Sequence, residues 1–294
     1  MISIVSPKCR SLSTEQNYLF WQVTDTDEDI YDYKFQILRS ESEAGPFMPV
    51  SDYFEDQYQF VDVNIPKFNI FRQLHYKIAI THKHSGNTTE SDAFSKDPEA
   101  NLIVTEIRTH INLLMREFVG RRCWVLPIRT FGQRCSDCYN FTLKKKRKSG
   151  CSNCFDSTFT RGYLKPIESW VQIDPNNNDE QQSTVGTLQP QNSTARMGFY
   201  PQLKPGDLIV EPENIRWRCI SVNSTQHNKA PIHQEVTLHQ IPTSDIEYKV
   251  PLELTASLAT MYLSPSRNFT NPQTIESAGD AEIPDILGIY PAAR

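Results

Sequence analysis

The first third of the chain alternates apolar and other residues in short runs, which is the pattern of β-strands that bury one face. The clearest runs are Tyr18–Val23, Tyr33–Arg39, Phe60–Val63 and Leu74–Ile80. Turn residues separate the runs at Gly45-Pro46 and at Ser85-Gly86-Asn87, and no helical pattern interrupts the series. Residues 1–97 are therefore predicted to form a small antiparallel β-sandwich.

The period of the pattern changes after residue 97, where apolar residues begin to recur at every third or fourth position. These residues are Val104, Ile107, Ile111, Leu114 and Phe118. They predict a helix over residues 100–119, within a linking segment 98–120 that ends at a capping glycine. Four more apolar residues broaden this stripe: Leu102, Ile103, Leu113 and Val119. The helix is therefore expected either to pack on its own domain or to line a contact between subunits.

Alternation returns after Gly120 and predicts a small β-barrel of about five strands over residues 121–250. Its predicted strands are Cys123–Arg129, Tyr163–Asp174, Leu208–Val210, Ile215–Val222 and Gln234–Ile241. The polar residues 174–196 are expected to form an exposed loop. Residues 251–294 are rich in Pro, Thr and Ser, and we expect them to form an extended C-terminal arm that docks on a neighbour. The predicted fold class is mainly β.

Four cysteines in two Cys-x-x-Cys pairs carry the strongest chemical signal. Cys135 and Cys138 form the first pair, Cys151 and Cys154 the second, and twelve residues separate the pairs. This spacing suits a closed tetrahedral site for structural zinc, which predicts a zinc knuckle over residues 133–156 at the tip of a hairpin. Two disulfides, a metal-free loop and an iron–sulfur cluster are the alternatives, with the cluster ranking below zinc. The remaining cysteines read as isolated thiols: Cys9, Cys123 and Cys219.

A run of five cations lies between the two cysteine pairs. The run consists of Lys144, Lys145, Lys146, Arg147 and Lys148, and four arginines flank the knuckle: Arg121, Arg122, Arg129 and Arg134. Five consecutive cations suit contacts with nucleic-acid phosphates. They also suit an acidic surface on a protein partner, or they offset the negative charge of a zinc tetrathiolate. No aromatic stacking platform is evident beside the run, which favours the last two interpretations.

Composition excludes some classes of function. A net charge of −5 argues against a protein that coats nucleic acid along its whole surface, and no apolar run is long enough to cross a membrane. The first residues lack the basic region and long apolar core of a signal peptide, which predicts synthesis in a reducing cytoplasm. The seven histidines are dispersed, and no catalytic motif is evident. The chain is therefore expected not to be an enzyme.

Residues 1–97 resemble a fibronectin type III domain. The resemblance rests on Trp21, the strand Tyr33–Arg39, the pattern Leu74-x-Tyr76-x-Ile78-x-Ile80 and the turn Ser85-Gly86-Asn87. In that family the fold is a binding or spacer module without catalytic residues. An unrelated β-sandwich of the same size is the alternative.

A second and more specific resemblance covers about residues 100–250. Three segments, together with the two cysteine pairs, are similar to virion proteins from the neck of tailed bacteriophages: Leu114–Gly120, Phe131–Tyr139 and Phe159–Tyr163. Two later segments resemble the β-barrels of head-closure proteins: Leu203–Val210 and Trp217–Ile220. The loop after Asp174 and the C-terminal arm fit no pattern of this family. A stopper, another neck protein and a tail component therefore all stay open.

The second resemblance implies a structural virion protein that is made in the host cytoplasm and located in the neck. Identical subunits would form a homo-oligomeric ring at the head–tail interface, built from the barrel and the helix. The ring would join the portal or adaptor protein to tail proteins and contact packaged DNA in its channel, with no membrane involved. The alternative from another class is a zinc-ribbon nucleic-acid-binding protein that uses Lys144–Lys148 on phosphates.

Overall fold

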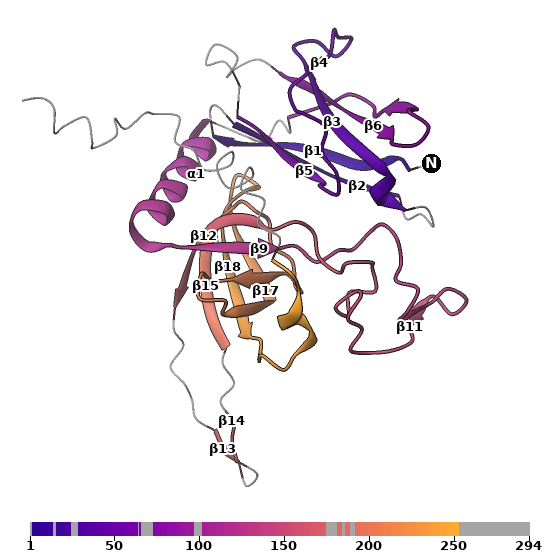
Figure 1. The fold of residues 1–294 in the computed structure, drawn as a ribbon. Coiled ribbons are helices and arrows are strands. Elements are labelled where there is room, and N and C mark those ends of the chain that lie inside the picture. The colour runs from indigo at the N-terminus through magenta and orange to yellow at the C-terminus, as the bar shows by residue number, and fades with distance from the viewer. Residues whose placement is uncertain are drawn as a thin grey trace, which may run out of the picture. The chain divides into compact units, whose positions relative to one another are not determined.

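The fold is mainly β, as predicted, with one α-helix of 13 residues and a closed barrel in the described part of the chain (Figure 1). The computed structural model describes residues 2–13, 16–24, 29–63, 65, 73–96, 102–174, 181–183, 186–188 and 192–252. Within this part of the chain, no helix is long and apolar enough to cross a membrane. The bulk of the predicted C-terminal arm, residues 253–294, lies outside the described residues.

Two antiparallel sheets form the N-terminal sandwich. The first sheet has the order β1-β2-β5, with β1 at Ile4–Ser13, β2 at Gln16–Val23 and β5 at Gln59–Asp62. The second has the order β4-β3-β6-β7, with β4 at Met48–Pro49, β3 at Tyr33–Ser40, β6 at His75–His82 and β7 at Thr88–Glu90, and β8 at Phe94–Ser95 also pairs with β6. A single turn of 3₁₀-helix, η1 at Ile30–Asp32, precedes β3. This is the two-sheet arrangement that the alternating runs predict.

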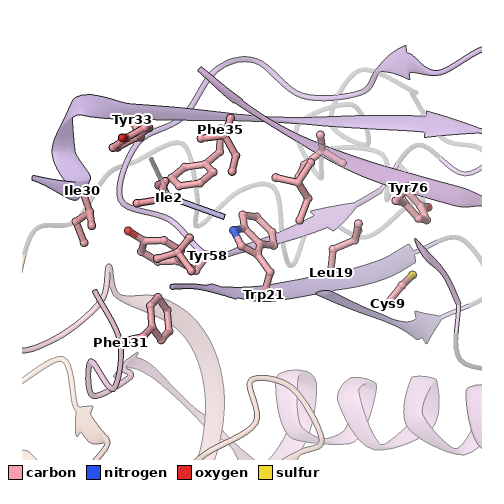
Figure 2. Close-up of a cluster of buried hydrophobic side chains, with 14 of the residues drawn as sticks. Ile2, Cys9, Leu19, Trp21, Ile30, Tyr33, Phe35, Tyr58, Tyr76 and Phe131 are labelled. Atoms are coloured by element: carbon pink, nitrogen blue, oxygen red, sulfur yellow. The ribbon is translucent and has the colours of Figure 1, made fainter. Parts of the chain in front are cut away.

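The core of the sandwich lies between the two sheets because alternate residues of each strand point inward. On β3 these are Tyr33, Phe35 and Ile37, all buried. Trp21 of β2 packs against Phe35 with ring centroids 6.2 Å apart, and Figure 2 shows both beside Tyr58. Large aromatic side chains thus fill the space between the sheets.

Strand β1 was not predicted, and its irregular geometry explains the omission. Its register with β2 shifts between Val5 and Lys8, where Ser6 adopts a positive φ of 48°. Pro7 in the same stretch has no N–H to donate to the sheet. The bulge breaks the two-residue alternation on which the sequence prediction depends.

The predicted helix is present, but most of its apolar stripe does not face the core. Helix α1 covers Leu102–Leu114 and continues as a π-helical turn, η3, at Met115–Val119, which the N–H of Gly120 closes by bonding to the Met115 carbonyl at 2.8 Å. The buried residues are Val104, Thr105, Arg108 and Met115. Leu114 is 48% exposed and Phe118 is 77% exposed. Part of the stripe therefore lies on the surface of the described chain.

Arg108 sets the rotation of this helix. Its Nη1 donates to the Ser11 carbonyl of β1 at 2.6 Å, and its Nε donates to the Pro231 carbonyl at 2.9 Å. The guanidinium also lies 3.8 Å from the ring centroid of Phe199. A buried guanidinium must keep such partners, so this polar residue faces inward at the expense of part of the apolar stripe.

Residues after Gly120 form a closed six-stranded barrel in the order β12-β15-β18-β17-β16-β9. The strands are β9 at Arg121–Leu126, β12 at Ile167–Asp174, β15 at Asn192–Gly198, β16 at Leu208–Val210, β17 at Arg216–His227 and β18 at Ala230–Gln240. The barrel core contains alternate residues of β18, among them Val236 and Leu238, against Met197 and Ile209. A 3₁₀ turn, η4 at Ile246–Lys249, follows the barrel. After this turn, the buried Val250 packs against residues of the barrel, among them Leu126 and Leu208.

The stretch 174–196, predicted to be an exposed loop, contains regular strands. Residues 192–196 belong to β15, where Ser193 and Ala195 are buried. Within the stretch, β13 at Gln181–Ser183 pairs with β14 at Gly186–Leu188. Strand β15 was not predicted because its residues are mostly small or polar and show no apolar alternation. Its place in the barrel comes from backbone pairing with β12 and β18.

Candidate metal centre

The cysteine-bearing segment connects two paired strands of the barrel. Strands β9 and β12 pair antiparallel. Isolated bridges at Ile128–Tyr163 and Arg134–Phe159 continue this pairing into the segments that follow β9 and precede β12. Beyond these bridges, β10 at Tyr139–Asn140 pairs with β11 at Lys145–Lys146. The knuckle is therefore mounted on a hairpin of adjacent strands, as the sequence analysis expected.

The four predicted ligands, Cys135, Cys138, Cys151 and Cys154, converge on one point. All four are buried, and their Sγ atoms lie within 4.8 Å of one another. Cys138 and Cys154 are 3.0 Å apart at Sγ, and Cys135 and Cys151 are 3.9 Å apart. Four sulfurs bonded at about 2.3 Å to one tetrahedral ion would lie about 3.8 Å apart, so these residues fit a single metal ion. None of the four forms a disulfide in the structure.

Each Cys-x-x-Cys pair is shaped by a backbone turn. The N–H of Tyr139 donates to the Cys135 carbonyl at 3.1 Å, and the N–H of Phe155 donates to the Cys151 carbonyl at 2.9 Å. These equivalent turns direct both sulfurs of a pair to one side. The N–H of Arg147 donates to the Cys138 carbonyl at 2.6 Å, which ties the basic run to the first pair.

The electrostatic environment of the thiols favours a bound cation. Burial raises the pKa of the Cys138 and Cys154 thiols. Burial acts in the same direction on Cys151, but the backbone N–H groups of Asn153 and Cys154 outweigh it and lower the pKa of that thiol. Without a cation, the Cys138 and Cys154 thiols hold their protons, because burial and the neighbouring thiols disfavour a negative charge there. Metal binding at this site is therefore coupled to proton release.

Asp156 is a supporting residue that the sequence analysis missed. Its Oδ1 accepts hydrogen bonds from the N–H groups of Gly150 at 2.9 Å and Cys151 at 3.2 Å, and lies 3.1 Å from Nζ of Lys146. Burial would raise the pKa of Asp156, but these N–H donors and the lysine lower it. One carboxylate thus links the second cysteine turn to β11. Only its position after Cys154 in the sequence hints at this role.

The five cations of the run are all exposed, at the end of the knuckle. Two large apolar side chains accompany them: Phe141 is 53% exposed and Leu143 is 62% exposed. Phe141 also packs edge-on against Tyr139, with centroids 5.5 Å apart. It lines a hollow of about 590 Å³ together with Gln133 and Asn153, among others. The structure thus places an aromatic side chain beside the run, where the sequence analysis found none.

The flanking arginines have structural partners. Arg121 pairs with Glu211 and Arg122 with Glu168, while Arg134 lies 3.9 Å from the ring centroid of Phe159. Arg129 is buried and pairs with Asp56 of the sandwich. These arginines therefore stabilise the barrel and the base of the knuckle.

Contacts with the sandwich hold the base of the knuckle. Phe131 belongs to the sandwich core and meets Tyr58 edge-on at 4.8 Å between centroids, as Figure 2 shows. Nζ of Lys165 donates to the Glu55 carbonyl at 2.7 Å. The metal centre is thus carried on a base with contacts to both the sandwich and the barrel.

A scan against protein-family models finds no match to the chain, and a search of the curated proteins finds no similar sequence.

Proposed function

We propose that Cys135, Cys138, Cys151 and Cys154 bind one zinc ion with a structural role. Support comes from the four buried sulfurs, whose mutual distances suit one tetrahedral ion. A cluster of several iron ions would hold the same sulfurs further apart. Four protein ligands leave no open position for water or substrate, so the ion stabilises the fold and takes no part in turnover.

We further propose that the chain is a structural subunit of the neck of a tailed-phage virion, where copies form a ring between the portal or adaptor protein and the tail. The observation that carries this proposal is the four-cysteine knuckle, which is inserted between adjacent strands of a closed barrel and ends in an exposed basic and apolar tip. Such a tip suits docking on a partner protein, because two exposed apolar side chains accompany the charges. The barrel makes the ring, and the sandwich serves as a spacer or binding module.

The solution mass of the purified full chain tests this proposal. With zinc at moderate salt, the chain is expected to form large rings, alone or with a portal or tail protein. Chelation of the metal is expected to prevent this assembly, because the docking tip then loses its brace. A metal-loaded chain that stays monomeric or dimeric with these partners would overturn the ring. Assembly that survives metal removal would overturn the brace.

A second candidate function, nucleic-acid binding by the knuckle, gains support from Phe141. An exposed aromatic ring beside exposed cations can stack on an unpaired base while the cations contact phosphates. Binding to a single-stranded oligonucleotide should then weaken steeply as salt rises. Replacing Lys144–Lys148 by serine should abolish that binding. Retention of the oligonucleotide by the serine variant would exclude this function.

A further inference from the structure

Helix α1 carries its most exposed apolar residues on the side away from the sandwich and the barrel. Leu102, Ile103, Leu113 and Leu114 are each between 48 and 53% exposed. With about 100° of rotation per residue, these four fall within an arc of about 120°, together with the exposed Glu106 and His110. We call these six residues the outer face of α1. The buried Val104 and Arg108 lie on the opposite side.

The outer face has an order that reads the same in both directions along the helix. Two apolar residues stand at each end, and Glu106 and His110 lie between them. When two copies of the helix are placed antiparallel and centred at residue 108, Leu102 meets Leu114 and Ile103 meets Leu113. Glu106 of each copy then meets His110 of the other, and the carboxylate can accept a hydrogen bond from the imidazole N–H. The apolar positions and these donor–acceptor positions are both complementary in this arrangement.

From this pattern we infer that the outer face binds the outer face of a second copy of this chain, as an antiparallel helix pair about a two-fold axis. A two-fold contact uses the same patch on both copies, so the patch must be complementary to itself. The outer face meets this condition in its apolar positions and in the pairing of a Glu106 acceptor with a His110 donor. Exposed apolar residues gathered on one helix also indicate an interface, since isolated monomers seldom expose such a surface.

The size of the patch supports a second copy as the occupant. The exposed surface of the four apolar residues of the outer face adds up to that of about two fully exposed large apolar side chains. Phe118 and Val119, which are 77 and 42% exposed, extend the apolar surface at one end. A two-fold pair buries this surface twice. That brings the contact toward the area of a specific dimer.

The inference goes beyond the proposed ring. A two-fold contact closes after two copies, whereas a ring uses a head-to-tail contact. The resemblance to phage neck proteins implies that α1 takes part in the ring. Its outer face instead pairs two chains, and the ring relies on other surfaces. The dimer can therefore exist whether or not the chain forms a ring, and the two proposals fail separately.

The contribution of the apolar residues is tested by measuring the dissociation constant of the dimer. Sedimentation of the full chain over a dilution series gives this constant. Leu114→Ser is expected to weaken the dimer by about tenfold or more. Met48→Ser, at an apolar residue of the sandwich that is 64% exposed, is the control and should leave the dimer unchanged. Far-ultraviolet circular dichroism checks that both variants fold. Equal behaviour of the two variants would overturn the proposal.

A charge exchange tests the antiparallel register. His110→Glu should weaken the dimer, because Glu106 of each copy then faces a second carboxylate on the other. Adding Glu106→Lys to the same chain should restore the dimer, since both facing positions then carry opposite charges. Failure of the double variant to dimerise would exclude this register. A full chain that stays monomeric, while a chain shortened to residue 252 dimerises, would show that the C-terminal segment covers the face and would also overturn the proposal.

Discussion

Arg129 and Asp56 form a buried ion pair. Arg129 lies in the segment that leads from β9 to the knuckle, and Asp56 belongs to the sandwich. Nη2 of Arg129 lies 2.7 Å from Oδ1 and 2.9 Å from Oδ2 of Asp56, and the arginine side chain is fully buried. Burial acts to lower the pKa of Arg129, but Asp56 outweighs it and the net shift is upward. Arg129 therefore stays charged, and its contact with Asp56 joins two parts of the chain that are distant in sequence.

Removing one member of this pair should cost much more than removing both. Arg129→Met leaves a buried carboxylate with only the more distant Arg161, at 4.0 Å, and should lower the free energy of unfolding by about 3 kcal/mol. Arg129→Met combined with Asp56→Asn should recover a large part of that loss, because asparagine is uncharged and tolerates the positive φ of 49° at this position. Chemical denaturation measures the recovery. Lys77→Met, at the exposed pair with Glu90, is the control and should cost about 1 kcal/mol or less. A single variant as stable as the control would contradict a role for the pair in holding the knuckle base.

Metal removal should unfold the knuckle and spare the barrel. Cys154→Ser should abolish binding of one zinc per chain, as elemental analysis measures, whereas Cys219→Ser, which removes a buried thiol of the barrel core, should retain the metal. Hydrogen exchange at the Arg147 amide, which bonds to the Cys138 carbonyl, should become fast after chelation. Continued protection of this amide would show that the knuckle folds without metal.

Gly162 supports the second cysteine turn and should not tolerate a side chain. Its φ is +70°, and an added Cβ would lie 2.5 Å from the Cys154 carbonyl oxygen. Gly162→Ala should therefore displace Cys154 and weaken zinc binding by about tenfold or more, as competition with a chelating dye measures. Gly150→Ala is matched in φ, at +72°, but meets no atom within 4 Å. Equal zinc affinities for the two variants would exclude the displacement of Cys154.

Asp207 should make the stability of the barrel depend on pH. Its carboxylate accepts hydrogen bonds from the N–H groups of Ile128 at 2.8 Å and Lys204 at 2.6 Å. Burial nevertheless raises the pKa of Asp207 to about 6 from an ordinary 3.8. Between these values the folded chain holds a proton that the unfolded chain has lost. Stability should therefore fall as pH rises from about 4 to about 6, by roughly 3 kcal/mol, and level off above.

Denaturation at pH 4.5 and pH 7 checks this linkage. The Asp207→Asn variant has no carboxyl group to ionise at this position, so it should not lose this part of the stability as pH rises. The variant should therefore become more stable relative to the wild type at pH 7 than at pH 4.5. Asp92→Asn, on the surface of the sandwich, should show no such shift. A constant difference between wild type and Asp207→Asn would mean that the carboxyl group titrates alike in both states.

Local patterns in the sequence predicted much of the fold. Alternation identified β2, β3 and β6, since a strand with one buried face must repeat every two residues. The cysteine spacing predicted the knuckle because a Cys-x-x-Cys turn brings its own two sulfurs together before any tertiary contact forms. These features depend on neighbours within a few residues of each other, which the order of amino acids records directly.

Other features were decided by contacts between residues far apart in the chain. The three-to-four-residue period predicted α1, but the partners of Arg108 on β1 and β18 chose which side of the helix is buried. Pairing with β12 and β18 made β15 a strand despite its polar residues. Asp56 faces Arg129 across 73 residues of sequence. No local pattern encodes such pairings, because a buried charge or backbone group takes whichever partner the folded chain brings to it.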